Sequence, residues 1–399
     1  MFKSWLVAGL LGALYACSAT VPVNKGQEAA IYRKTLDQLT EKAISYLEVM
    51  PADSTAIPRA LSPDGTLHKT TSRDWTSGFY AGELWMLYDY SGKGLLKEAA
   101  QAWTAFNAKE QWDTHTHDLG FKIYCSFGHG YQITADEAYK EVIVNASRTL
   151  IKRFDPKVGC IRSWDFNSDI WHFPVIVDNL MNLEMLFASS RLTGDSSFFN
   201  IANSHAQTTL VNHIRADHSS YHVIDFDPET GQQRLKDTHQ GAAKESSWAR
   251  GQAWNLYGFA MAYRETQAPQ FLEQARGVAA YIYEHPNMPK DQVPYWDFEA
   301  PHIPNEPRDV SAAAINACGL LILAEQNPEY ASQYLKWADA TLASLAQERY
   351  QSETPPFLLK HSVGSIPGNF EVDVPIIYAD YYYVEALLRR LAFAEKANK

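Results

Sequence analysis

The chain has 399 residues, of which 46% are hydrophobic and 20% are charged, and its formal net charge is −11 at pH 7. The apolar content is sufficient for a large folded core, and the acidic balance argues against a general nucleic-acid-binding surface. It does not exclude an anionic small molecule, because such a ligand needs only a few local cations.

The N-terminal segment predicts export. Residues 1–17 carry one lysine and an apolar run that ends at Cys17, which is too short for a membrane span and typical of a secretory signal peptide. Leu14-Tyr15-Ala16-Cys17 also resembles a bacterial lipobox, in which the cysteine is lipidated after cleavage. We expect a periplasmic protein anchored to a bacterial membrane through Cys17, with 18–26 as a tether; export without a lipid is the alternative.

Two kinds of helical segment alternate along residues 27–397, which we interpret as a single domain. Amphipathic segments with charged faces cover 27–50, 95–110, 136–153, 196–215, 269–285 and 329–348. Segments rich in Ala, Gly and aromatic residues cover 77–91, 118–132, 177–192, 246–265, 310–326 and 378–394. The second kind is apolar nearly all round and must be buried, whereas the first must lie outside it. Six such pairs predict an all-α fold, an (α/α)6 barrel with inner and outer rings; a two-domain helical array is the alternative.

The connections predict which face of the barrel is functional. Most of those that precede inner helices are long and rich in Trp, His, Pro and Asp, namely 51–76, 154–176, 216–245, 286–309 and 349–377. Connections on the other side are short, as in Thr193-Gly194-Asp195. The long loops should gather over the N-termini of the inner helices, and loops held on a rigid scaffold commonly carry the functional site.

The start of the fourth inner helix combines one cation with several indoles. Ser246 and Ser247 can cap the helix, and Arg250 and Trp254 share a face because they are four residues apart. Together with Trp248, they suit a flat anionic ring that stacks on indole and is attracted by the guanidinium. The alternative is a buried helix whose arginine pairs with a core carboxylate.

Two carboxylates occupy the starts of other inner helices. Asp178 follows the apolar run 173–177, which would desolvate its carboxyl group and raise its pKa, as a proton donor requires. Asp118 lies between two histidines and a Gly-Phe pair and has the surroundings of an ionised, hydrogen-bonding group. Trp164, upstream of Asp178, is a candidate sugar platform. Ordinary helix capping is the alternative for either aspartate, and the apolar run and the upstream tryptophan argue against it for Asp178.

Other sites receive less support. His222 and His239 are candidate donors or cations near an anionic ligand, although loop carbonyls can satisfy either ring. The His115-Thr116-His117 pair has no third ligand at a suitable spacing, so we expect neither a metal ion nor another cofactor. The sequence holds no G-x-S-x-G elbow and no phosphate loop. Cys125, Cys160 and Cys318 resemble neither a disulfide framework nor a zinc site, although export would permit one disulfide.

Several of these motifs, taken together, resemble the unsaturated glucuronyl hydrolases of glycoside hydrolase family 88. The matching segments are RDWTSGFYAGELW (73–85), HDLGF (117–121), VDNLMNLEML (177–186), SSYH with DPETG (219–231), THQG (238–241), SSWARGQAW (246–254) and YADYYYVEAL (378–387). They occur in one order across nearly the whole mature chain. The resemblance implies an (α/α)6 barrel, in agreement with the helix count.

The resemblance also implies residue roles. Asp178 matches the catalytic acid/base, and Asp118 matches a second essential carboxylate that holds substrate hydroxyls. Trp75 and Trp164 match stacking tryptophans. The residues that match the lining of the pocket are His222, Gln240, Trp248, Arg250 and Trp254.

The implied reaction is hydration of a vinyl ether rather than ordinary glycoside hydrolysis. The substrate is an oligosaccharide that a polysaccharide lyase has left with a C4=C5 double bond in its terminal uronic acid, here one derived from a glycosaminoglycan. In the loop Lys360–Asp373, we expect Lys360, Ser362 and Ser365 to contact the next sugar or its sulfate; the alternative is a loop that only packs under the last inner helix. The Ser-Lys sulfate signature of some relatives has no equivalent after Gly368.

Two other functions fit parts of the sequence. An unsaturated rhamnogalacturonyl hydrolase would use the same barrel and chemistry on pectin fragments, but HDLGF together with THQG favours the glucuronyl type. A non-catalytic glycan-binding lipoprotein would retain the tryptophans and lose Asp118 or Asp178, and both carboxylates are present.

Overall fold

The computed structural model describes residues 25–62 and 64–396. The predicted signal peptide, Cys17 and most of the predicted tether lie outside these residues. Twelve α-helices, with several 3-10 or π-helical turns and nine short strands, make up the part of the chain that the model describes. None of the helices in this part is long and apolar enough to cross a membrane.

The amphipathic segments form the predicted helices, each with a polar face toward solvent. Because their charged residues occupy one side only, the opposite side packs on the apolar helices. Their bounds, each within a few residues of the predicted range, are α1 (Lys25–Leu47), α3 (Gly94–Ala105), α5 (Glu137–Leu150), α7 (Ser196–His213), α9 (Pro269–Glu284) and α11 (Ala331–Leu345).

The apolar segments form the buried helices. In α10, for example, every residue from Val310 to Ala324 is buried. The bounds of these helices are α2 (Phe79–Ser91), α6 (Leu183–Thr193), α8 (Ala249–Thr266), α10 (Val310–Gln326) and α12 (Ile377–Lys396). The second apolar segment is instead buried over residues 120–128 and ends in the short, partly exposed helix α4 (His129–Thr134).

Three of the buried segments open with turns that are not α-helical, a detail that periodicity does not predict. They are the 3-10 turn η1 (Trp75–Gly78), the π-helix η3 (Gly120–Gly128) and the 3-10 turn η5 (Val177–Asn182). Tight contact between η3 and η5 accompanies this geometry, since the Asn182 side chain accepts a hydrogen bond from the Phe121 N–H at 3.2 Å. Short π-helical stretches occur frequently at functional sites.

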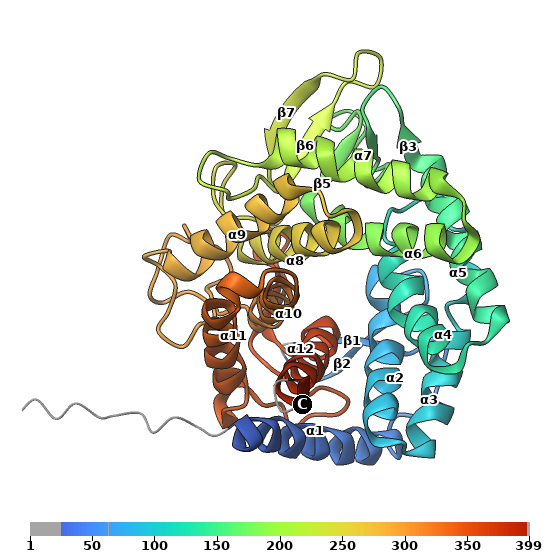
Figure 1. The fold of residues 1–399 in the computed structure, drawn as a ribbon, viewed down its shortest axis with the longest axis vertical. Helices are drawn as coiled ribbons and strands as arrows, with labels where there is room; N and C mark the ends of the chain where they lie inside the picture. The colour runs from blue at the N-terminus through green and yellow to red at the C-terminus, as the bar shows by residue number, and fades with distance from the viewer. Residues whose placement is uncertain (1–24, 63, 397–399) are drawn as a thin grey trace, which may run out of the picture.

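Neighbouring buried elements pack on one another along the chain (Figure 1). The π-helix η3 contacts α2 and α6, α8 contacts η5 and α10, and α10 contacts α12. The last helix, α12, also packs against α2 and α1, so the two ends of the described chain lie side by side.

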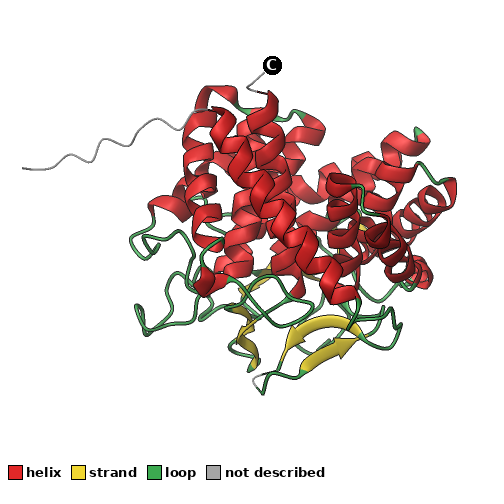
Figure 2. Cartoon of the chain, turned by 90° about the horizontal axis from the view of Figure 1, so that it is seen from below, coloured by secondary structure: helices red, strands yellow, loops and turns green. Residues whose placement is uncertain are grey.

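The nine strands lie in or beside the long connections, and they amend the all-α prediction. They are too short for a period-2 pattern to be recognised in the sequence. Figure 2 shows that they and most of the long loops gather on one side of the helices, as expected. The antiparallel groups are β1 (Ile57–Leu61) with β2 (Leu67–Thr70), β3 (Phe154–Asp155) with β4 (Cys160–Ile161), β5 (Pro174–Ile176) with β6 (Val223–Phe226) and β7 (Gln233–Asp237), and β8 (Ser362–Ser365) with β9 (Phe370–Val374).

Small residues let the buried helices approach closely. A Cβ atom at Gly82 of α2 would collide with the carbonyl oxygen of Cys125 in η3 and lie 2.6 Å from a ring carbon of Tyr381 in α12. Cys125 itself is buried and unpaired, as are Cys160 and Cys318. The sequence permitted one disulfide, but none joins these three cysteines.

We expect Gly82→Ala to lower the free energy of unfolding by about 1–3 kcal/mol, because the added methyl group forces α2 away from η3 and α12. Chemical denaturation measures this change. Gly94→Ala at the start of α3 is the matched control, since a Cβ there meets nothing within 4 Å. The close packing of α2 would be contradicted if the two variants were equally stable.

Candidate active site

A cavity of about 650 Å³ opens among the long loops, at the N-terminal ends of the buried helices. Its walls come from η1, η3, η5, α8 and α12 and from the loops that precede them. Seven of the residues that the sequence singled out line it: Trp75, Asp118, Trp164, Asp178, His239, Gln240 and Arg250.

Asp178 is held at the cavity by the short sheet in front of its helix. β5 pairs with β6, and the Val177 N–H donates to the carbonyl oxygen of His222 at 3.0 Å, so the chain enters η5 along the sheet edge. The side chain therefore comes directly after three buried apolar residues, and Asp178 as a whole is only 9% exposed.

This placement changes the acidity of Asp178. Burial raises the pKa of its carboxyl group from 3.8 to about 7, against the opposing positive charge of Arg250 and the influence of His117. Its Oδ2 atom is buried without a hydrogen-bond partner among the described residues. A carboxyl group in this state can hold a proton at neutral pH and donate it to a ligand.

Asp118 has the opposite character. Burial alone would raise its pKa, but the contacts with His117 and Thr116 and the charge of Lys122 together lower the pKa below 3.8. The His117 Nε2 atom lies 3.1 Å from Asp118 Oδ1, and the Thr116 hydroxyl donates to Oδ2 at 2.7 Å. The cavity thus pairs an ionised carboxylate with a protonated one, an arrangement that separates acid and acceptor roles.

His222, which the resemblance placed in the pocket lining, does not line the cavity; it lies beside Asp178 in a defined tautomer. Its Nδ1 atom accepts from the backbone N–H groups of His239 at 3.1 Å and Gln240 at 3.3 Å. A ring nitrogen that accepts from N–H groups carries no proton, so the proton of the neutral ring is on Nε2. The Nε2 atom lies 3.9 Å from Asp178 Oδ2, and burial keeps the pKa of His222 well below 6.5.

Arg250 lines the cavity, where its charge can attract an anionic ligand, and it also pairs with the buried carboxylate of Asp309. Each of the two interpretations of this arginine, ligand binding and a core ion pair, therefore holds in part. Its Nη1 atom donates to Asp309 at 3.0 Å and to the carbonyl of Val363, and its Nη2 atom donates to the carbonyl of Gly364 at 2.8 Å. Arg250 therefore fastens β8 to the start of α8 while placing a positive charge near Asp178.

The tryptophans divide into cavity and core residues. Trp75 packs against Tyr378 at 4.9 Å between ring centroids, and Trp164 stacks on Phe166 at 5.0 Å with the rings nearly parallel. Trp248 does not line the cavity but lies against the His222 ring at 4.6 Å. Trp254 lies deeper, among Phe121, Tyr382 and the core, because it is one turn farther along the same face of α8 than Arg250.

The loop at 360–373 reaches the cavity through residues other than those expected. Ser362 and Ser365 are buried in and around β8, and neither they nor Lys360 line the cavity. The Ser365 hydroxyl instead accepts from the Gly368 N–H at 3.0 Å. Gly364, Phe370 and Glu371 form this part of the wall, because the β8–β9 hairpin places them at the cavity while Ser365 holds the turn.

Comparison with known proteins agrees with this geometry. The model of Glycosyl Hydrolase Family 88 matches residues 55–388. The chain belongs to glycoside hydrolase family 88. It is 44% identical over 96% of both chains to an unsaturated glucuronyl hydrolase of Formosa agariphila, and 33% identical to an unsaturated chondroitin disaccharide hydrolase of Streptococcus pneumoniae, over 90% of this chain and 92% of that one.

A solved structure of the family is also similar throughout. It is an unsaturated glucuronyl hydrolase specific for heparin, with a TM-score of 0.87 and 43% identity over 91% of this chain and 98% of that chain. As a member of the family, the chain is a glycoside hydrolase.

Sequence reasoning missed several residues of this family 88 cavity. Arg59 reaches it from β1, where it pairs with Asp74 and with both oxygens of Glu371. Tyr378 reaches it from the second residue of α12. Nothing in the sequence near Arg59 indicates that it meets residues more than 300 positions away, whereas the position of Tyr378 at an inner-helix start was a usable signal.

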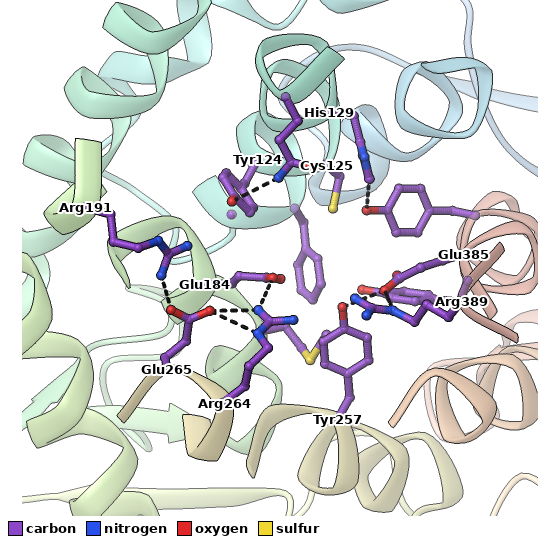
Figure 3. A pocket seen from close by; sticks show the side chains of 16 residues that line it. Tyr124, Cys125, His129, Glu184, Arg191, Tyr257, Arg264, Glu265, Glu385 and Arg389 are labelled. Carbon is purple, nitrogen blue, oxygen red and sulfur yellow. Dashed lines mark hydrogen bonds and ion pairs between the residues drawn. The ribbon is translucent and has the colours of Figure 1, made fainter. Parts of the chain in front are cut away.

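A second cavity, of about 320 Å³, lies farther along the buried helices (Figure 3). Its charged groups pair with one another across helices, as in Arg264 with Glu184 at 2.5 Å and Tyr257 with Glu385 at 2.9 Å. Burial acts to raise the pKa of Glu184, but the charge of Arg264 outweighs burial and holds the pKa below 4.5. This carboxylate therefore offers no proton near neutral pH. Only Phe121 lines both cavities among the described residues.

No group of three or more His, Cys, Asp or Glu side chains suited to a metal ion occurs in residues 25–62 and 64–396. His117 contacts Asp118, while His115 is exposed beside Asp113. The H-x-H pair thus serves hydrogen bonding in the cavity wall.

Asp178 should make the enzyme less stable as the pH rises. The folded state binds the Asp178 proton more tightly than the unfolded state, so its contribution is present below about pH 4 and is lost as the pH rises to about 7. We therefore expect Asp178→Asn to exceed the wild type in unfolding free energy by on the order of 2–4 kcal/mol at pH 8, and by little at pH 4.5.

Asp165→Asn is the control for this measurement. The Asp165 side chain is exposed, and although its partial desolvation acts in the other direction, Arg153 lowers its pKa. It therefore contributes stability above its unfolded pKa that is lost as the pH falls. Its variant should be less stable than the wild type at pH 8. Equal pH dependence of Asp178→Asn and the wild type, measured by urea unfolding at both pH values, would contradict the raised pKa.

Proposed function

We propose that residues 27–397 form one catalytic domain, an (α/α)6 toroid. The strict alternation of buried and amphipathic helices supports this arrangement, as do the contacts of α12 with both α10 and α2. Figure 1, in which the buried helices lie nearer the centre than their partners, agrees with it. In such a toroid, the N-termini of the inner helices converge on the cavity of Asp118 and Asp178.

We propose that the enzyme releases the unsaturated glucuronic acid from the non-reducing end of lyase-generated glycosaminoglycan oligosaccharides. The observation that carries this proposal is the buried Asp178 carboxyl group, whose pKa of about 7 lets it hold a proton, beside the ionised Asp118. The activities of the similar hydrolases support the substrate class.

In the first step, Asp178 donates its proton to C4 of the C4=C5 double bond. The positive charge that develops at C5 is shared with the ring oxygen, as expected for a protonated vinyl ether. Water then attacks C5 and returns a proton to the Asp178 carboxylate, so the group acts in turn as general acid and general base. The net change is the addition of one water molecule across C4=C5.

The product of hydration decomposes without a second protein acid. The new hemiketal at C5 opens to a ketone, the bond between C1 and the glycosidic oxygen breaks, and the remaining sugar leaves with a proton. Ordinary glycosidases instead place two carboxyl groups at the anomeric carbon. One group with a pKa near neutrality suffices here, which leaves Asp118 to accept hydrogen bonds from substrate hydroxyls.

Two neighbours assist Asp178 in this scheme. The His222 Nε2–H group faces Asp178 Oδ2 and can stabilise the carboxylate that forms when the proton leaves. Arg250 supplies a fixed positive charge that limits the rise in the Asp178 pKa and favours an anionic uronate nearby. Trp75 and Trp164 provide ring surfaces against which a sugar can pack.

The cavity wall around Arg59 favours substrates in which the sugar next to the unsaturated glucuronic acid carries little sulfate. The guanidinium of Arg59 is already paired with Asp74 and Glu371, and Phe370 beside it is partly exposed. A sulfate placed beside Arg59 would be repelled by the Glu371 carboxylate, because the Arg59 guanidinium is already paired with Asp74 and Glu371. We propose that the enzyme prefers disaccharides without sulfate at the position that faces Glu371.

We expect Asp178→Asn to reduce kcat by about 10³-fold while the protein still folds, because an amide cannot donate a proton to C4. The decrease in ultraviolet absorbance of the conjugated C4=C5 bond, followed on a panel of lyase-generated disaccharides, measures it. In the wild type, kcat/KM should fall as the pH rises through about 7, where Asp178 loses its proton. Asp195→Asn, at the exposed cap of α7, is the matched control.

Near-normal turnover by Asp178→Asn would remove Asp178 from the reaction. Wild-type turnover of rhamnogalacturonan products alone would favour the pectin-specific alternative. Binding of these sugars without turnover would favour a glycan-binding protein.

We also propose that the protein is exported to the periplasm and lipid-anchored through Cys17. The short apolar run followed by Leu14-Tyr15-Ala16-Cys17 supports this proposal. When the chain is produced in bacteria grown with a clickable fatty acid, we expect label on the wild type and none on Cys17→Ser. Equal labelling of both proteins, or of neither, would contradict the lipid anchor.

A further inference from the structure

The loop of residues 238–242, between β7 and α8, directs four successive backbone N–H groups toward fixed acceptors. The first two, from His239 and Gln240, donate to His222 Nδ1. The third, from Gly241, donates to the Thr238 hydroxyl at 2.8 Å, and the fourth, from Ala242, donates to Asp297 Oδ2 at 2.8 Å. The loop that orients His222 is therefore also hydrogen-bonded to Asp297.

Asp297 is a buried carboxylate that does not line the cavity. Its Oδ2 atom accepts from the Ala242 N–H and from the Ser246 hydroxyl at 2.7 Å, while its Oδ1 atom accepts from the Glu299 N–H at 2.9 Å. Three donors converge on two oxygens, an arrangement that a carboxylate satisfies and that a single amide oxygen cannot.

The segment that carries Asp297 is itself anchored to the start of α8. The Ala249 N–H donates to the carbonyl of Trp296 at 3.0 Å, and the Phe298 N–H donates to the carbonyl of Ser247 at 3.1 Å. Packing also leaves the loop little room, since a Cβ at Gly241 would lie 2.7 Å from the Thr238 hydroxyl and 3.2 Å from Asp297 Oδ2. The carboxylate thus holds the loop against a rigid element.

We propose that Asp297 is a positioning residue that fixes His222 in its Nε2–H tautomer by holding the 238–242 loop against the Nδ1 atom. The inference rests on the proposed function only for its effect on turnover. Asp297 does not line the cavity and touches neither Asp178 nor His222 directly. Asp297 acts through the N–H groups of His239 and Gln240, which can donate only to an unprotonated Nδ1 atom of His222.

The surroundings of His222 make the tautomer sensitive to this loop. Among the described residues, only the loop N–H groups and the Thr238 hydroxyl face Nδ1, while the carboxyl of Asp178 faces Nε2. The remaining neighbours are the Trp248 ring and the charged or titratable groups of His239, Arg250 and His213. Without the loop donors, a proton on Nδ1 meets no N–H group that opposes it, so the ring can adopt the other tautomer or take a second proton.

Asp297→Asn tests this role directly. In the wild type with ¹⁵N-labelled histidine, we expect the His222 signals of a neutral Nε2–H ring, unchanged between about pH 5 and about pH 8. In Asp297→Asn we expect a mixture of tautomers and a titration within that range. The His222→Gln variant, which lacks these signals, assigns them among the 13 histidines of the chain.

Kinetics of the same variant give a second readout. We expect kcat to fall by about tenfold with KM changed by less than about threefold, and the rate to decline at acidic pH where His222 becomes protonated. Asp291→Asn is the matched control, because Asp291 lies in the same 286–309 loop and binds Arg308 and Tyr350 without touching residues 238–246. It should keep the wild-type tautomer and pH profile.

Ser246→Ala removes one donor to Asp297 Oδ2 and leaves the carboxylate in place. It should give a smaller change in the same direction, and it replaces Asp297→Asn if that variant does not fold. A single Nε2–H tautomer in both variants, or the same spectral change in Asp291→Asn, would overturn the proposal. A wild type that turns over no unsaturated uronide would refute the proposed function alone, because the tautomer is measured without substrate.

Discussion

The burial of one carboxyl group is the constraint on which the rest of the site depends. Asp178 follows directly on a buried strand, and its environment makes the charged form unfavourable enough to keep a proton near neutral pH. The surrounding elements serve this condition: the fully buried strands β5 and β6 lie beside the group, and the opposing charge of Arg250 limits the rise in its pKa. A more exposed position would yield an ordinary carboxylate that could not protonate carbon.

The two aspartates illustrate how environment assigns roles to chemically identical groups. Asp178 is buried and Asp118 is partly buried. The contacts of Asp118 with His117 and Thr116 outweigh its desolvation, while no comparable donor among the described residues reaches Asp178 Oδ2. The nearest candidate, His222 Nε2–H, stands 3.9 Å away, a distance that a small movement closes once the carboxylate becomes charged. The same loop that holds His222 in place also contacts β8 through the Gln240 side chain, so the base of the cavity is one connected network.

Much of the architecture could be predicted from the sequence, because it follows from local patterns. The alternation of apolar and amphipathic segments predicts eleven of the twelve α-helices of the described residues, whereas the segment predicted at 118–132 is mostly the π-helix η3. The resemblance to family 88 singled out Asp118 and Asp178, and both line the cavity. The π-helix and 3-10 turns that open three inner segments were not predictable, since they arise from contacts such as that between Phe121 and Asn182. The nine short strands were not predicted either, because they are too short for a period-2 pattern to be recognised in the sequence.

The cavity wall was harder to predict than its centre. Arg59 and Glu371 meet across more than 300 residues, a pairing that no local pattern records. Lys360, Ser362 and Ser365 were chosen for their chemistry, but in a short hairpin the side chains that point inward are set by the turn, and the wall is made by Gly364, Phe370 and Glu371. Trp254 shares a helix with Arg250 yet packs in the core, because one helical turn separates the cavity floor from the interior.

Titration of Asp178 itself tests the central claim most directly. The carboxyl signal of ¹³C-labelled aspartate, assigned as the one missing from Asp178→Asn, should move with a midpoint at about pH 7 in the protein without substrate. The Asp118 signal should stay that of an ionised carboxylate down to below pH 4. A midpoint for Asp178 below about pH 5 would contradict the account, because the group would then carry no proton to donate at neutral pH.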